Sequence, residues 1–345
     1  MAWDWTSDTT AALATYLDSR GILAGPITTR AIGDGHSNLT FLVSGGGTSV
    51  VVRRPPPPPT PPGAHDMVRE ATLLSALSTT AVPVPDVLAV AQAGDVLDVP
   101  LYVMSFSEGP VVTDRTPAPL DTPDQRRSIG HHLVDTLVDL HAVDWRAIGL
   151  EKFGRPEGFN VRHLERIKRL VADDDGCAPD GFGGVEDWLT SNVPTESGAT
   201  LVHCDYRIGN VILAPNEPGR VAAVLDWELA TLGDPLLDVG YLLATVPEPG
   251  LPTNPTSELA LAMLEDGYPS RTQLVERYAH RSGRDVSALS WYTTFALWKL
   301  AVLYEYSRRR VLAGVGDPYY TDPVLVQRFL SDARRSAGLT GTNAQ

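Results

Sequence analysis

The spacing of apolar residues changes about one third of the way along the chain. Early segments are short and rich in β-branched residues, which is typical of strands. Two stretches in this part repeat apolar residues at helical spacing, and the second follows Asp66, a residue suited to an N-cap. We therefore expect helices at residues 9–23 and 66–77 and an antiparallel sheet formed by residues 27–32, 39–43, 49–53, 87–90 and 101–104.

Beyond a connector at residues 105–109, helical spacing dominates. A turn-rich segment, Pro215–Gly219, separates two apolar runs at residues 211–213 and 221–225 and predicts a hairpin. The fold expected is α+β with two lobes. After the leading helix, residues 1–106 are expected to form an antiparallel sheet plus one helix, residues 66–77, and residues 107–345 a larger, mainly helical lobe. Its expected helices span residues 124–141, 161–171, 185–189, 236–244, 257–264, 271–280 and 290–312.

Polar clusters flank this hairpin. Asp205 and Asn210 precede it, and Asp226 follows it, with spacings of five and then sixteen residues. A hairpin brings its two ends together, so we expect the three side chains to converge. One carboxylate can take the proton of an attacking hydroxyl, while an amide and a second carboxylate can hold magnesium on nucleotide phosphates. The pattern indicates phosphoryl transfer, with a nucleotide pocket between the lobes.

Composition narrows the class of protein. Of 345 residues, 43% are apolar and 20% charged, which is typical of a folded globular chain. The formal charge of -14 argues against nucleic-acid binding and favours neutral or cationic substrates, unless a basic pocket reverses it locally. Two cysteines, no signal-peptide pattern at the start and no apolar run of about 18 residues predict a cytoplasmic protein outside the membrane.

Two segments, His203–Asn210 and Leu225–Asp238, resemble the aminoglycoside phosphotransferase family, which has a protein-kinase-like fold. Residues 35–41, 51–55 and 297–303 extend the resemblance, which covers roughly residues 27–312. The likeness is strongest to the subgroup related to the kinase-like domains found with acyl-CoA dehydrogenases. It implies that Asp205 is the catalytic aspartate and that Asn210 and Asp226 are the magnesium ligands.

The resemblance also implies a nucleotide site in the first lobe. The glycine-bent turn would contribute Gly33, Gly35 and Ser37, and the cleft edge Met104 and Ser105. Arg53 stands where kinases have a phosphate-binding lysine, and Glu70 is its expected ion-pair partner.

Other positions leave alternatives open. Cys204 stands where the family usually has glycine, and a redox role is one hypothesis for it. Arg207 either stabilises charge on the transferring phosphoryl group or pairs with a structural carboxylate. Arg308–Arg310 are either a solvated helix end or a site for an anionic substrate.

The expected activity is magnesium-dependent transfer of the γ-phosphoryl group of ATP, with GTP not excluded, to a hydroxyl of a small molecule. The resemblance to the acyl-CoA-dehydrogenase-associated subgroup implies a hydroxyacyl-CoA-type metabolite as acceptor. Resistance enzymes of the resembled family usually concentrate acidic residues near the C-terminus, whereas residues 321–345 here hold only two, Asp322 and Asp332, so the metabolite is favoured. An aminoglycoside is the alternative, and a catalytically silent nucleotide-binding protein is another. The motifs do not indicate an oligomeric state.

Overall fold

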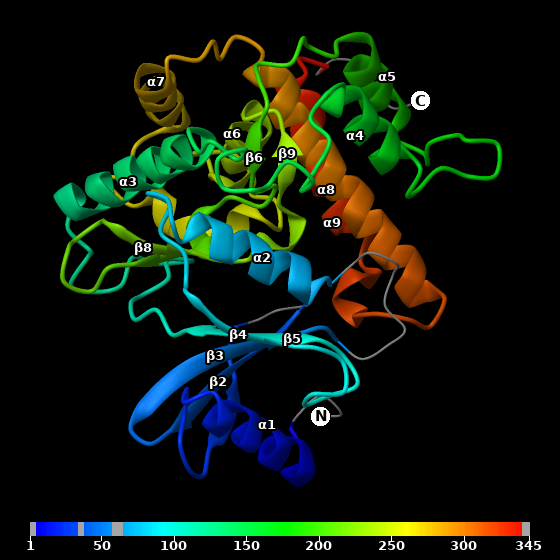
Figure 1. Ribbon diagram of the computed structural model, residues 1–345. Helices are drawn as coiled ribbons and strands as arrows, with labels where there is room; N and C mark the ends of the chain where they lie inside the picture. The colour runs from blue at the N-terminus through cyan, green and yellow to red at the C-terminus, as the bar shows by residue number, and fades with distance from the viewer. Residues whose placement is uncertain (1–4, 34–37, 57–64, 340–345) are drawn as a thin grey trace. The chain divides into compact units, whose positions relative to one another are not determined.

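The computed structural model describes residues 5–33, 38–56 and 65–339. The chain divides into two compact units, the first comprising Met1–Glu108 and Ala222–Glu228, the second Gly109–Val221 and Leu229–Gln345. The first unit contains an antiparallel sheet, and the second is mainly helical (Figure 1). This arrangement confirms the predicted α+β fold class.

The sheet of the first unit has the strand order β1-β2-β3-β5-β4, and every neighbouring pair is antiparallel. β3 is central, and its Arg53 lies opposite Thr40 of β2 and Tyr102 of β5. Because both edges of β3 are paired, the Arg53 side chain leaves a fixed backbone. The strands are β1 (Thr28–Ala31), β2 (Leu39–Gly45), β3 (Thr48–Arg54), β4 (Val87–Ala91) and β5 (Leu101–Ser105).

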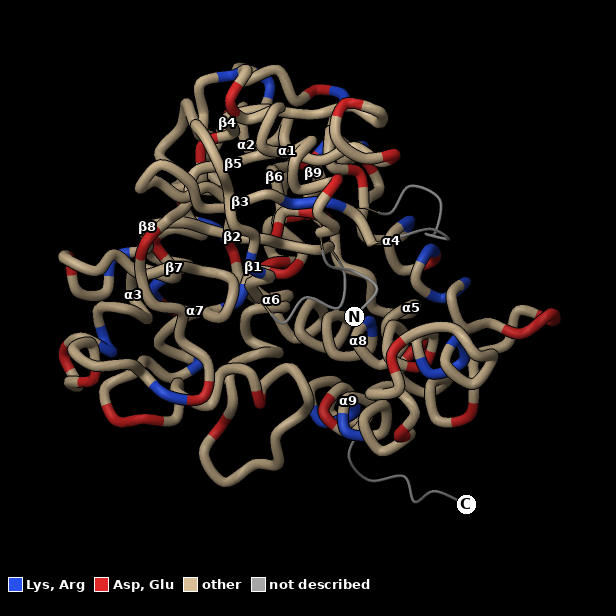
Figure 2. Tube along the Cα trace, turned by 90° about the horizontal axis from the view of Figure 1, so that it is seen from below, with Lys and Arg blue, Asp and Glu red and all other residues tan. Residues whose placement is uncertain are grey.

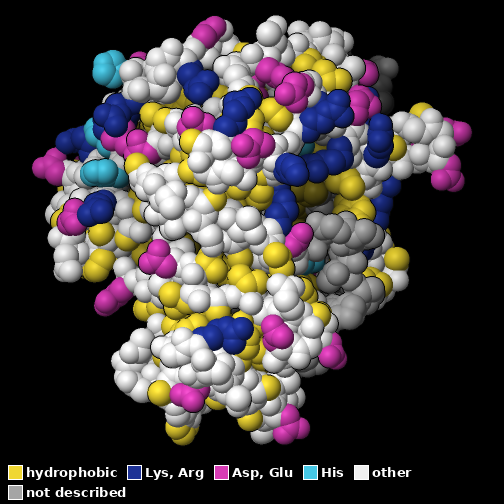
Figure 3. Space-filling model, viewed as in Figure 1, with side chains coloured by type: hydrophobic (Ala, Val, Ile, Leu, Met, Phe, Trp, Pro, Cys, Tyr) yellow, Lys and Arg dark blue, Asp and Glu magenta, His cyan; other side chains and the backbone are white. Residues whose placement is uncertain are grey.

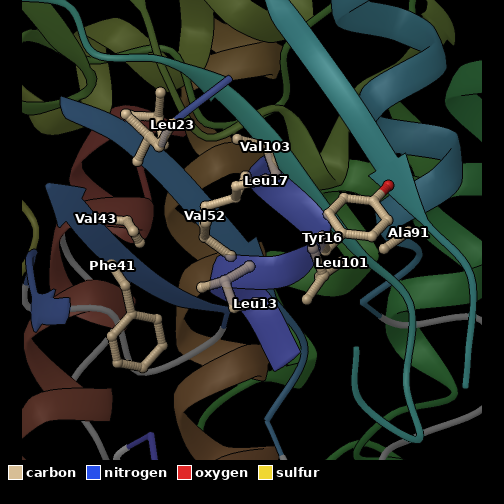
Figure 4. Packing of buried hydrophobic residues seen from close by; sticks show 11 residues of the cluster. Leu13, Tyr16, Leu17, Leu23, Phe41, Val43, Val52, Ala91, Leu101 and Val103 are labelled. Carbon is tan, nitrogen blue, oxygen red and sulfur yellow. The ribbon is translucent and has the colours of Figure 1, made fainter. Parts of the chain in front are cut away.

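Two helices accompany this sheet. α1 (Ser7–Ser19) contributes Leu13, Tyr16 and Leu17 to an apolar cluster with residues of β2, β3 and β5 (Figure 4). It ends four residues earlier than expected, because Gly21 adopts a left-handed conformation (φ 64°) and donates its N–H to Asp18. α2 (Met67–Leu77) begins at Asp66, whose side chain accepts the Arg69 N–H, as predicted.

The second unit is organised around α8 (Leu289–Leu312), whose core-facing residues include the fully buried Tyr292 and Trp298. It packs against α6 (Leu236–Thr245), α9 (Pro323–Ser336), α4 (Phe159–Lys168) and α5 (Gly183–Ser191). The other helices of the second unit are α3 (Pro123–His141), α7 (Arg271–Ser282) and the 3-10 segments η1 (Ile208–Asn210), η3 (Ser257–Leu264) and η4 (Pro318–Thr321). The 3-10 segment η2 (Trp227–Leu229) has its first two residues in the first unit.

Short strands surround the predicted site. β6 (Thr200–Val202) pairs with β9 (Thr231–Gly233), and β7 (Val211–Leu213) leads into the predicted turn. The turn closes where the Ala214 N–H donates to the Arg220 carbonyl at 2.8 Å, and β8 (Val221–Val224) follows. The hairpin therefore forms where the sequence predicted it.

Besides the earlier end of α1, the structure differs from the sequence prediction in several elements. Residues 257–264, expected to be α-helical, are 3-10 with a break at Ala260 (φ -137°). The strands β6 and β9 and the helix α9 were not predicted. In the part of the chain that the structure describes, no helix has the length and apolar character needed to cross a membrane.

Candidate active site

Residues 203–210 form a loop of the second unit that follows β6, and a buried carboxylate holds its start. The N–H groups of His203 and Cys204 donate to the two oxygens of Asp238, each at 2.7 Å. Asp238 lies in the first turn of α6 and also faces His141 Nε2 at 3.3 Å. Burial alone would raise the pKa of Asp238, but the bonds from His141 and His203 lower it. Asp238 is thus an ionised brace of the loop.

Cys204 adopts a left-handed backbone conformation, with φ 68°. Glycine has no Cβ to strain there, which accounts for the glycine of the family pattern at this position. The Cys204 side chain is buried, and burial followed by the charge of Asp238 raises the pKa of its thiol to about 12. A thiolate is therefore not formed near neutral pH, which argues against a redox role.

Asp205 and Asn210 lie side by side in this loop. Asn210 Nδ2 donates to the Asp205 carbonyl at 2.8 Å and to Asp205 Oδ2 at 2.9 Å. The Asp205 N–H donates to His203 Nδ1 at 3.2 Å. His203 Nδ1 therefore accepts a hydrogen bond within the loop, which favours a structural role over that of a catalytic base. Both contacts of Asn210 with Asp205 use the Asn210 amide nitrogen, so neither of them occupies its amide oxygen.

Arg207 lies beside the same carboxylate, with Nε 3.8 Å from Asp205 Oδ1. Both side chains are about one-fifth exposed. The structure therefore pairs Arg207 with Asp205 itself. Stabilisation of a transferring phosphoryl group by Arg207 stays a prediction.

In the first unit, Arg53 is buried within a group of carboxylates. Its Nη2 contacts Asp226 Oδ1, its Nε lies 3.5 Å from Glu70 Oε2, and Glu228 Oε2 is 3.7 Å away. Burial alone would lower the pKa of Arg53, but the charges of Glu70 and Asp226 raise it. The predicted Arg53–Glu70 contact is present. Phosphate binding by Arg53 stays a prediction, as does the nucleotide-site role of Glu70.

Two other polar residues of the first unit have different contacts: Arg54 lies near aromatic rings, and Asn38 binds a carboxylate of the Arg53 group. The Arg54 guanidinium lies 5.3 Å from the centre of the Phe41 ring and 5.5 Å from that of Trp5, as expected for the opposite face of the strand. Asn38 Nδ2 donates to Glu228 Oε2 at 2.6 Å, which extends the polar network around Arg53.

The other residues predicted for the nucleotide site stay predictions, and the structure describes only some of them. Gly33 has φ 79°, consistent with a bent turn, whereas Gly35 and Ser37 lie outside the described residues. Met104 is buried in β5. The Ser105 N–H donates to the Asp86 carbonyl, and the Ser105 hydroxyl oxygen accepts the Asp86 N–H, at 2.9 Å each.

The donor set suits magnesium. Asn210 offers an amide oxygen and Asp226 a carboxylate, and hard cations of this size prefer oxygen ligands. Asn210 belongs to the second unit and Asp226 to the first. Their meeting around one ion stays a prediction.

The arginines at the end of α8 are already paired. Arg308 Nε lies 2.7 Å from Glu305 Oε2, and Arg309 Nε lies 2.9 Å from Glu305 Oε1. Burial alone would raise the pKa of Glu305, but the hydrogen bonds from these arginines lower it. Two of the three arginines thus neutralise a buried carboxylate, which weakens the case for an anionic-substrate site here.

Sequence reasoning missed two residues near Asp205. Burial, followed by the charge of Asp205, raises the pKa of the Tyr241 hydroxyl of α6 well above its usual 10, which indicates that this hydroxyl lies near the carboxylate. Lys299 Nζ of α8 donates to the Cys204 carbonyl at 3.3 Å. Lys299 stood within a matched segment of the resemblance, but periodicity could not show which side chains of a buried helix reach the loop.

Comparison with known proteins gives consistent results. A profile described as the phosphotransferase enzyme family matches residues 28–292. The Arabidopsis thaliana protein named probable acyl-CoA dehydrogenase IBR3 is 35% identical over 296 residues, covering 80% of this chain and 36% of that protein. Acyl-CoA dehydrogenase family member 11 of Mus musculus is 32% identical over 302 residues, covering 86% and 38%. The chain thus spans little more than a third of the length of these relatives.

Solved structures of other proteins have the same fold as this chain. A Ralstonia eutropha protein assigned to the aminoglycoside phosphotransferases has a TM-score of 0.79 at 27% identity and covers 96% of this chain and 99% of its own. A complex of a thermostable APH(4)-Ia with ADP and hygromycin B has a TM-score of 0.59 at 17% identity, covering 96% and 100%. The second likeness concerns the fold alone.

Proposed function

The chain belongs to the phosphotransferase enzyme family, and from this premise we propose that it transfers the γ-phosphoryl group of ATP to a hydroxyl group of a small molecule. The observation that carries the proposal is the Asp205–Asn210 pair on a loop braced by Asp238. A carboxylate and an amide oxygen held this firmly suit a proton acceptor beside a metal ligand. GTP remains an alternative donor, and the cytoplasm is the compartment we propose.

Asp205 orients the acceptor hydroxyl and receives its proton late in the transfer. Asn210 and Asp226 would be the protein ligands of Mg²⁺, which when bound would neutralise charge on the phosphate oxygens. We further propose that Arg53 contacts the nucleotide phosphates, with Glu70 restraining its guanidinium, and that Gly33, Gly35 and Ser37 belong to the same nucleotide site. Arg207, beside Asp205, stabilises charge on the group in transfer.

For the acceptor, we propose a metabolite of the hydroxyacyl-CoA type. Its support is the likeness to proteins named as acyl-CoA dehydrogenases, although this chain spans only about a third of their length. An aminoglycoside is the second candidate, favoured by the formal charge of -14. Magnesium–ATP consumption measured against hydroxyacyl-CoAs, aminoglycosides, sugars and amino alcohols separates these classes. Thermal stabilisation by nucleotide without transfer to any acceptor would indicate the silent alternative.

Replacement of Asp205 by Asn tests the catalytic role. The variant keeps the shape of the side chain and loses the proton acceptor, so we expect kcat to fall about 10²- to 10⁴-fold. The Kd for ATP, measured by thermal shift, should change by less than about twofold. The exposed Asp121→Asn variant is the matched control and should keep wild-type turnover. Wild-type turnover in Asp205→Asn would refute the role.

A further inference from the structure

Lys299 is a buried cation in the middle of α8. Its side chain is 5% exposed, and its ammonium lies 5.2 Å from the centre of the Tyr241 ring. Among the residues that the structure describes, no carboxylate forms an ion pair with Lys299. Its ammonium donates a hydrogen bond to the Cys204 carbonyl at 3.3 Å. Burying a lysine without a carboxylate partner is costly. Such a residue is more readily explained by a function than by a contribution to stability.

The close crossing of two helices places Lys299 under the loop. A Cβ added to Gly240 of α6 would lie 2.5 Å from the backbone of Tyr292, so α6 and α8 meet there almost in contact. Tyr241 follows Gly240 directly. Lys299 stands seven residues after Tyr292, two turns along the same face of α8. Both side chains therefore project from the crossing towards residues 203–210.

The contacts of Lys299 and Asp238 fall on successive peptide units. Asp238 binds the N–H of Cys204, which belongs to the peptide unit before that residue. Lys299 binds the Cys204 carbonyl, which belongs to the unit after it, and the N–H of that same unit donates to His203 Nδ1. Fixing both units fixes the two dihedral angles of Cys204. That residue has φ 68°, a conformation unfavourable for a non-glycine residue by roughly 1 kcal/mol or more.

We propose that Lys299 is a positioning residue for Asp205, the residue that immediately follows Cys204. Lys299 holds the loop in the left-handed turn that presents the Asp205 carboxylate. Tyr241 links Lys299 to Asp205, because its hydroxyl binds Asp205 while its ring lies beneath the Lys299 ammonium. The inference rests on the proposed catalytic role of Asp205. Lys299 itself touches neither the nucleotide nor the acceptor in this scheme.

Amide hydrogen exchange measures how firmly Lys299 restrains residues 203–210, and it requires no phosphate acceptor. Lys299→Met keeps the length of the side chain and removes the donor. We expect the amides of residues 203–210 to exchange about tenfold faster or more, because a hydrogen bond from a charged group is lost. The amides of α3 should keep their wild-type rates. Unchanged exchange in the loop overturns the proposal, and so does equal acceleration in α3, which would indicate general destabilisation.

Kinetics test the consequence for turnover. With the acceptor identified in the screen, Lys299→Met should lower kcat about tenfold or more while the KM for ATP stays within about twofold, because a small misplacement of a reacting group is costly. An unchanged kcat, or a loss confined to KM, would contradict the proposal. If the wild-type protein transfers phosphate to no acceptor, the proposed function fails, and the exchange result still decides whether Lys299 holds the loop.

Tyr241→Phe isolates the second contact. It removes the hydroxyl and keeps the ring beneath Lys299, so kcat should fall about threefold or more while loop exchange stays at the wild-type rate. Tyr268→Phe, which removes a hydroxyl bonded to Thr116 at 2.9 Å, is the control and should change neither. Equal kinetics for the two tyrosine variants would remove Tyr241 from the scheme.

Discussion

At the scale of single residues, His163 illustrates how burial controls charge. It is 7% exposed, stacks on Phe159 with ring centres 5.1 Å apart, and meets the edge of Phe295 at 5.3 Å. Burial, followed by the charges of Lys299 and Arg166, lowers the pKa of His163 well below its usual 6.5. The Arg166 guanidinium lies 3.0 Å from Nδ1, so this nitrogen accepts and the ring is neutral.

This shift predicts acid sensitivity. Below pH 6.5 the unfolded chain binds a proton at His163 that the folded protein does not, so stability is retained above that pH and lost below it. The free energy of unfolding should fall by up to about 1.4 kcal/mol per pH unit from this group. His163→Phe should show a shallower decline between pH 6.5 and about pH 5 in urea titrations. The exposed His280→Gln should match the wild type; an equally steep decline in His163→Phe would contradict the assignment.

At the scale of elements, the α6–α8 crossing depends on one missing side chain. A Cβ at Gly240 would lie 2.5 Å from the Tyr292 carbonyl carbon and 2.8 Å from the Thr293 nitrogen. These are backbone atoms of a helix, which cannot turn aside as a side chain can. The two helices would have to separate, and both carry residues that contact the loop at Asp205.

Gly240→Ala should therefore destabilise the protein by about 1–3 kcal/mol, as overpacking does. Chemical denaturation measures this directly. Gly184→Ala is the control, because an added Cβ there has open space and alanine favours the helix by up to about 1 kcal/mol. If both variants were equally stable, the crossing would be looser than described.

The sequence predicted most elements but not all of them, for physical reasons. Three-residue strands such as β6 and β9 are too short to show alternation, and long-range pairing creates them. For α9 the signal was present: Asp322 caps a helix whose first residue is Pro323, and Val326, Phe329 and Leu330 are buried at helical spacing. In the site, the motifs identified Asp205, Asn210 and Arg53. Tyr241 and Lys299 reach the loop only through the helix crossing, which no local pattern encodes.

At the scale of the whole molecule, charge dominates long-range interactions. The formal charge is -14, yet Lys and Arg are interspersed with Asp and Glu along the trace (Figure 2) and on the face shown in Figure 3. Such a distribution repels anions at long range without preventing local recognition. Screening by salt should therefore affect different acceptor classes in opposite directions.

For an anionic acceptor of the hydroxyacyl-CoA type, kcat/KM should rise about twofold or more as KCl increases from roughly 20 to 200 mM at saturating magnesium–ATP. A polycationic aminoglycoside would show the reverse. The salt dependence of kcat/KM for a neutral sugar alcohol, where the protein phosphorylates one, is the reference, because an uncharged acceptor has no net attraction or repulsion to screen. A decline with salt for the preferred acceptor would favour the aminoglycoside reading.

The contact between Arg53 and Asp226 also bears on how the protein is made. The two residues are 173 positions apart in sequence, yet both belong to the first unit. A ribosome adding about 5–20 residues per second would need roughly 10–35 s to deliver the aspartate after the arginine. For that interval the nascent sheet holds Arg53 with Glu70 but without Asp226 and Glu228. The first unit therefore reaches its finished polar network only after more than a hundred residues of the second have been synthesised.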